Sequence, residues 1–136
     1  MLTRKTKYGL KALIYIAKQD RSKPVLISEI AEHENISKKF LETILLDLKK
    51  NGVLGSKMGK GGGYYLLKDA RDVKIASLIR ILDGPIALLP CVSLNFYEKC
   101  EDCPSEETCS LNRVMIQVRD NALSILEQKS LYDLTV

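Results

Sequence analysis

The sequence predicts a mainly α-helical protein with one small β-hairpin and a long C-terminal helix. Three observations indicate this fold class. Apolar residues recur at helical spacing through most of the first 50 residues, and two short apolar runs flank a glycine-rich stretch near residue 60. A heptad repeat of apolar residues then occupies residues 111–125. The 136 residues amount to one domain with an extension.

The first 52 residues predict three successive helices. Apolar residues at helical spacing form the first helix over residues 3–18 and a short second helix over residues 28–34. Ser37 is a suitable N-cap for a third helix over residues 38–50, and Asn51-Gly52 ends it because both residues tolerate a left-handed backbone. Four apolar residues of the third helix are expected to face inward: Leu41, Ile44, Leu45 and Leu48.

A hairpin and a fourth helix follow. Short strands are expected at residues 53–58 and 64–67, joined by the glycines of residues 59–63, which allow positive φ in the turn. The fourth helix is expected over residues 74–82, where Asp83-Gly84-Pro85 stops it. Three helices followed by a glycine-tipped hairpin are the order of a winged helix-turn-helix.

The last third of the chain has a different character. Residues 90–110 show no periodicity and contain all four cysteines, whereas residues 111–128 predict a helix with a heptad seam. The seam consists of Leu111, Met115, Val118, Ala122 and Ile125. We expect this helix to pair with a second copy in a homodimer. The predicted organisation is a DNA-binding domain over residues 1–84, a cysteine-rich cluster-binding loop over residues 85–110, and a dimerisation helix with its tail over residues 111–136.

Charge is distributed unevenly along the chain. Residues 1–80 carry 17 Lys and Arg against 8 Asp and Glu, a net +9, whereas residues 81–136 carry 4 against 9, a net −5. A basic half predicts a polyanionic partner. No apolar run approaches the roughly 18 residues of a membrane span, and the start lacks a signal peptide's apolar stretch. We therefore expect a cytoplasmic protein with no membrane partner. A single histidine, His33, disfavours a hydrolase of the serine–histidine kind.

The winged order predicts binding to double-stranded DNA, with the third helix in the major groove and the hairpin, or wing, near the backbone. The outward residues of the third helix are placed to reach phosphates and base edges, and the wing lysines are placed to neutralise phosphates. The candidates from the third helix and the wing are Ser37, Lys38, Lys39, Glu42, Thr43, Lys57 and Lys60. The alternative is a small helical protein that binds only other proteins.

The cysteines read Cys91-x8-Cys100-x2-Cys103-x5-Cys109. Four thiols within one short segment suit a tetrahedral zinc site or an iron–sulfur cluster of the 2Fe-2S or 4Fe-4S type. Three alternatives stay open. Cys100 and Cys103 form a redox pair in a small thiol oxidoreductase, the cysteines hold zinc in an interaction module, or the thiols carry no cofactor.

Several motifs together resemble a known family of winged-helix repressors. They are Leu2-Thr-x-Lys-x-x-Tyr-Gly-Leu-x-Ala-Leu, Leu48-x-x-Asn-Gly, Gly59-Lys-Gly-Gly-Gly-Tyr and the late cysteines. The family includes the iron–sulfur cluster assembly regulator, the nitric-oxide-sensing repressor and the cysteine-metabolism repressor. The resemblance implies a homodimeric bacterial repressor that binds a palindromic operator and, in cluster-binding members, responds to an iron–sulfur centre held by three cysteines.

The resemblance also implies roles for individual residues. Glu42 matches a glutamate that reads bases, and Lys5 and Tyr8 match first-helix positions near the DNA backbone. The three cluster cysteines of the family match Cys91, Cys103 and Cys109, and the additional Cys100 is the expected fourth ligand. Two positions depart from the pattern. Met58 stands where the wing often carries an arginine, and Asn112 stands where the cluster assembly regulator has a histidine ligand.

Overall fold

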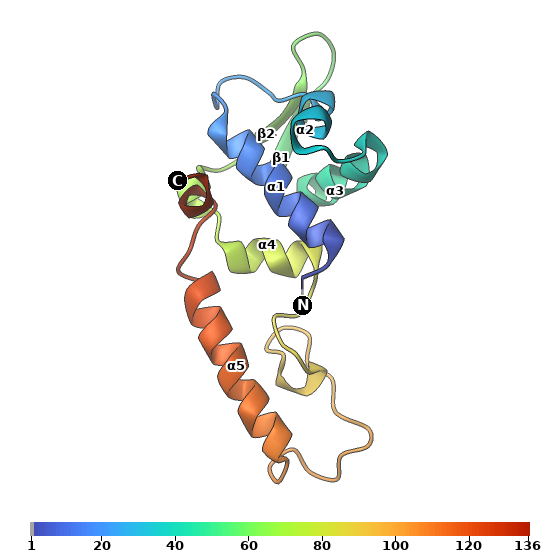
Figure 1. The fold of residues 1–136 in the computed structure, drawn as a ribbon, viewed down its shortest axis with the longest axis vertical. Helices are drawn as coiled ribbons and strands as arrows, with labels where there is room; N and C mark the ends of the chain where they lie inside the picture. Colours follow the sequence, from blue (N-terminus) through green and yellow to red (C-terminus); the bar gives the residue numbers. More distant parts are fainter. Residues whose placement is uncertain (1) are drawn as a thin grey trace.

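The computed structural model describes residues 2–136 and confirms a mainly helical fold with a two-stranded hairpin (Figure 1). The elements in chain order are α1 (Arg4–Lys18), α2 (Ile27–Glu34), α3 (Lys38–Lys50), β1 (Leu54–Lys57), β2 (Gly63–Leu66), η1 (Ala70–Asp72), α4 (Ile75–Leu82), η2 (Pro90–Val92), α5 (Ser110–Leu126) and η3 (Tyr132–Thr135), where η marks a short 3-10 helix. Each predicted helix and strand is present, with ends shifted by one or two residues.

Local capping interactions explain where these helices begin and end. The Thr3 hydroxyl accepts a hydrogen bond from the backbone N–H of Thr6 at 3.2 Å, and the Ser37 hydroxyl accepts one from Phe40 at 3.1 Å. Both satisfy N–H groups that have no partner within the helix. Asn35, at φ 54°, ends α2 in the left-handed conformation and turns the chain tightly into α3.

The core lies where α1, α2, α3 and α4 converge against the hairpin (Figure 1). The four residues of α3 predicted to face inward are all fully buried. Gly9 of α1 permits close helix contact, because a Cβ atom at this position would lie 2.6 Å from Cδ1 of Leu82 in α4. Burial of α3 against three helices fixes which of its faces points to solvent.

The wing is fastened to the rest of the domain by a short third strand segment. β1 and β2 pair antiparallel with Leu54 opposite Leu66 and Lys57 opposite Gly63. Val25, just before α2, pairs with Tyr64 of β2 through two backbone hydrogen bonds of 2.8 Å each. Gly63 adopts φ 140°, and a Cβ there would lie 2.4 Å from the Val25 carbonyl oxygen. This position therefore requires glycine.

The C-terminal half extends from the core and then returns to it. α5 lies beyond α4, at the opposite end of the molecule from the wing (Figure 1). After α5 the chain pairs Ser130 with Lys74, and Leu131 is fully buried in the core. The last turn, η3, then lies against α1. None of the helices in residues 2–136 is long and apolar enough to cross a membrane.

Candidate functional site

The outward face of α3 is free of intramolecular packing. Lys38, Lys39, Glu42 and Thr43 are all exposed, on the side opposite to the buried leucines. Ser37 is also exposed, but its hydroxyl is engaged as the N-cap of α3. The helix therefore offers two cations, one carboxylate and one hydroxyl along a single exposed face.

Lys5 and Tyr8, predicted to lie near a DNA backbone, both make contacts that position α3. The Lys5 ammonium lies 2.6 Å from the carboxylate of Asp47, and each side chain is about one-third exposed, at 36% and 35%. The Tyr8 ring meets the ring of Phe40 edge-on, with centroids 5.6 Å apart. Part of the Lys5 charge is thus neutralised within the protein, and α1 is tied to both ends of α3.

The wing carries exposed lysines beside a groove that sequence reasoning missed. Lys57, Met58 and Lys60 are exposed, and Met58 is 92% accessible. The wing and the α1–α2 loop together form a groove of about 360 Å³ lined by Arg21, Ser22, Pro24, Ser56, Lys57 and Tyr65. Pairing of Val25 with β2 brings the wing and the α1–α2 loop together. No local pattern in the sequence predicts that pairing.

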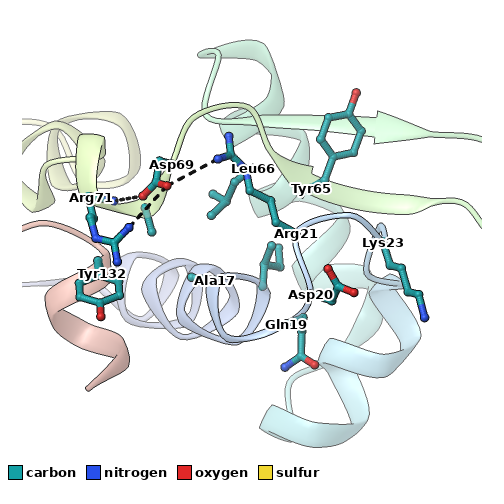
Figure 2. Close-up of a pocket in the computed structure, with 12 residues that line it drawn as sticks. Ala17, Gln19, Asp20, Arg21, Lys23, Tyr65, Leu66, Asp69, Arg71 and Tyr132 are labelled. Atoms are coloured by element: carbon teal, nitrogen blue, oxygen red, sulfur yellow. Dashed lines mark hydrogen bonds and ion pairs between the residues drawn. The ribbon is translucent and has the colours of Figure 1, made fainter.

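A neighbouring pocket shows how the charges behind the wing are balanced (Figure 2). Asp69 lies between Arg21 and Arg71, with nitrogen–oxygen distances of 3.7 and 3.8 Å. The Arg71 guanidinium stacks over the Tyr132 ring at 4.4 Å from its centroid. This row links the wing-side loop to the C-terminal turn, so its role in the fold is structural.

All four cysteines line one cavity. The cavity has a volume of about 570 Å³, and its other lining residues include Glu98, Glu106 and Asn112. Each cysteine is half-buried and free of disulfide bonds. Within residues 2–136, however, no three Cys, His, Asp or Glu side chains converge closely enough to hold a metal ion. The structure thus brings the predicted ligands to one place without closing them into a coordination sphere.

Two of the cysteines are anchored to α5. Cys109 is the N-cap of α5, and its sulfur accepts a hydrogen bond from the backbone N–H of Asn112 at 3.4 Å. That N–H, together with the Cys103 thiol, lowers the pKa of Cys109. The Nδ2 group of Asn112 donates to the sulfur of Cys91, also at 3.4 Å. Asn112 is buried, with 6% exposure, and so connects two cysteines far apart in sequence.

The other two cysteines contact mainly their own loop. The Cys100 thiol donates to the carboxylate of Asp102 at 3.0 Å, which raises the pKa of Cys100 to about 11. Burial and the hydrogen bond with Cys109 raise the pKa of Cys103. Cys100 is therefore protonated near neutral pH, and a metal ion has to displace its proton to bind it.

Most of the predicted seam of α5 is uncovered in the single chain, whereas Met115 and Ala122 are half-buried. Leu111, Val118 and Ile125 are 55%, 41% and 59% exposed, and the neighbouring Val114 is 51% exposed. An apolar groove of about 180 Å³ lies beside this face, lined in part by Ile79, Pro85, Leu88 and Ala122. An apolar face of this extent is typical of an interaction surface.

Comparison with known proteins identifies the family of this chain. The family model for Rrf2, described as an iron-dependent transcriptional regulator, matches residues 2–136. The chain belongs to the Rrf2 family. An Rrf2-like HTH-type transcriptional regulator of Rhodobacter capsulatus is 44% identical over 137 residues, which cover 98% of this chain and 91% of the relative. The IscR regulator of Photorhabdus laumondii is 30% identical, with 98% of this chain and 77% of the relative covered.

Solved Rrf2 structures have the same fold. CymR, the global cysteine regulator of B. subtilis, superposes with a TM-score of 0.81 at 28% identity, covering 99% of this chain and 95% of CymR. These similarities confirm the winged-helix fold and the family resemblance drawn from the motifs. The chain is a DNA-binding transcriptional regulator and not an enzyme. The alternative of a small thiol oxidoreductase using Cys100 and Cys103 was therefore wrong.

Proposed function

We propose that this Rrf2 protein is a homodimeric repressor whose binding to a palindromic operator responds to an iron–sulfur cluster held by its cysteine loop. One observation carries the proposal. Four cysteines line one cavity at the N-terminus of α5, and α5 carries the exposed apolar seam. Sensing and dimerisation thus share one helix. The division into residues 1–84, 85–110 and 111–136 corresponds to these roles, except that residues 130–135 return to the first domain.

DNA recognition is assigned to α3 and the wing. Lys38 and Lys39 at the start of α3 approach phosphates, while Glu42 and Thr43 one turn later approach base edges in the major groove. Lys57 and Lys60 add phosphate contacts from the wing and release counterions on binding. Ser37, Lys5 and Tyr8 support this face, Ser37 as the cap of α3 and the other two as contacts that orient the helix.

The proposed dimer pairs the α5 seams of two copies. Leu111, Val118 and Ile125 are largely exposed in one chain, and their burial at about 25 cal/mol per Å² favours association. A two-fold axis between two α5 helices relates the two winged domains, so that each reads one half of a palindrome.

The donor chemistry of the cavity fits an iron–sulfur cluster. Thiolates are the usual ligands of such clusters, and Cys91, Cys103 and Cys109 with Cys100 supply the required four. Within residues 2–136 no three of these side chains converge closely enough to hold a metal ion, so the four sulfurs have to move closer together for the site to form. A bound cluster supplies a centre that changes charge or is lost under oxidative or iron-poor conditions. The zinc-stabilised alternative uses the same four thiols.

The decisive experiment compares apo and reconstituted protein. The chain is purified anaerobically and examined by absorption spectroscopy together with iron, sulfide and zinc analysis. Operator DNA, selected from a random-sequence pool, is then titrated with both forms by fluorescence anisotropy. Brown protein with iron and sulfide and a changed operator affinity supports the proposal. Colourless protein with one zinc ion per chain supports the zinc alternative. Equal affinity of the two forms would contradict a sensing role.

A further inference from the structure

Asn112 is a polar residue with a buried side chain. It lies in the first turn of α5, and its side chain is buried against the cysteine cavity at 6% exposure. A buried amide needs hydrogen-bond partners, and here the partner of its Nδ2 group is the sulfur of Cys91 at 3.4 Å. The backbone N–H of the same residue donates to the sulfur of Cys109, also at 3.4 Å.

We infer that Asn112 is a positioning residue, which holds Cys91 beside Cys109 through N–H···S hydrogen bonds and does not itself bind metal. This inference rests on the proposed function, since it concerns the ligands of the same cavity. An amide nitrogen has no free lone pair for a metal, and an amide oxygen is a hard ligand poorly matched to a site of thiolates. Cys100, which lines the same cavity, remains the proposed fourth ligand.

A second contact holds Cys91 from the other side. The Arg119 side chain is only 15% exposed, and its Nη1 group donates to the carbonyl oxygen of Val92 at 2.9 Å. Asn112 and Arg119 lie two turns apart on α5, and together they clip η2, which contains Cys91, onto that helix. By contrast, Cys100 contacts Asp102 within its own loop.

The four cysteines of the cavity therefore differ in how firmly the fold positions them. Cys91 and Cys109 are held on α5 before any ligand arrives, which lowers the ordering cost of binding. Cys103 already hydrogen-bonds Cys109, and Cys100 has to leave the Asp102 carboxylate to join them. Hydrogen bonds to ligating groups of this kind typically change metal affinity by roughly 10- to 100-fold.

Substitution of Asn112 separates a positioning role from a ligand role. Asn112→Ala removes the donor, and Asn112→Asp keeps the shape while removing the N–H group. Asn121→Ala, at an exposed position on the same helix, is the matched control. In the reduced apo-protein, alkylation of each cysteine is followed by mass spectrometry. Alkylation is measured on the high-pH plateau, where the Cys91 thiol is ionised in each variant and the rate reports accessibility alone. Loss of one hydrogen bond is expected to speed alkylation of Cys91 there about fivefold. Cys109 keeps its backbone donor and is expected to react at the unchanged rate.

Cobalt(II) binding to the apo-protein provides the second measurement, through sulfur-to-cobalt charge-transfer absorption. Asn112→Ala is expected to bind Co²⁺ roughly 10- to 100-fold more weakly with an unchanged spectrum per bound ion, whereas Cys100→Ser alters the spectrum. An unchanged alkylation rate of Cys91 in both variants would overturn the inference, as would an altered cobalt spectrum in Asn112→Ala. If the wild-type chain binds neither Co²⁺ nor a cluster while the alkylation effect persists, the proposed function fails and the positioning of Cys91 stands.

Discussion

Replacement of Gly63 by alanine tests how the wing is fastened to the domain. At φ 140° an L-residue is strained, and its Cβ would lie 2.4 Å from the Val25 carbonyl oxygen. The Val25–Tyr64 pairing, with its two hydrogen bonds of 2.8 Å, has to open to relieve the clash. Strain of about 1–2 kcal/mol and two lost hydrogen bonds of about 1 kcal/mol each predict a loss of about 3–4 kcal/mol in the free energy of unfolding.

Gly61→Ala is the matched control for this prediction. Gly61 also has a positive φ, 74°, but nothing lies within 4 Å of its would-be Cβ. Backbone strain alone predicts a loss of about 1 kcal/mol for this variant. The free energy of unfolding is measured by urea denaturation, and hydrogen exchange of the Val25 and Tyr64 amides reports the local opening. Equal losses for the two variants would refute the reasoning, because the clash with Val25 is what distinguishes them.

Three further predictions concern the proposed surfaces, and a fourth concerns the C-terminal turn. Lys60→Ala is expected to weaken binding to all DNA sequences and to reduce the slope of log K against log salt concentration by about one. Glu42→Ala is expected to relax discrimination among operators at a modest cost in affinity, measured by competition titration. Val118→Glu is expected to convert the dimer to monomer in sedimentation experiments, because it places a charge in the apolar seam. The Ser130 N–H and hydroxyl lower the pKa of Asp133, so its contribution to stability is present above the unfolded pKa of about 4 and is lost as pH falls toward the folded value. Asp133→Asn is expected to remove that part of the acid dependence of urea unfolding.

The three predictions on DNA binding and dimerisation have a control variant or a defined contrary result. Lys129→Ala, at an exposed lysine outside α3 and the wing, is expected to leave the salt slope unchanged. Unaltered sequence preference in Glu42→Ala would place α3 outside the major groove. Gln117→Glu adds the same charge to an exposed position of α5 outside the heptad seam and is expected to leave the dimer intact. A sedimenting monomer of the wild-type chain at micromolar concentration would remove the dimer from the proposed function.

The fold was predictable from the sequence because its signals are local. Ser37 caps α3, Asn51-Gly52 ends it, and the period of its leucines identifies the buried face, all within one stretch of chain. The interactions that escaped prediction join distant segments. The Lys5–Asp47 ion pair spans 42 positions, and the pairing of Val25 with Tyr64 depends on a turn of φ 140° at Gly63. Periodicity carries no information about either contact.

The cysteine site was predictable in composition but not in arrangement. Spacing identified the four thiols as one group, and the cavity confirms that they lie together. Spacing could not indicate that Cys91 and Cys109 belong to the structure of α5, because this follows from the buried amide of Asn112. The division has a functional consequence for the proposed sensor. Cys91 and Cys109 are held on α5, so a ligand that orders the cysteine loop around them also contacts the helix that carries the proposed dimer seam. Ligand binding and the arrangement of the dimer would then be coupled. Coupling of this kind is typically about 1–3 kcal/mol, enough to change operator occupancy by roughly 5- to 150-fold.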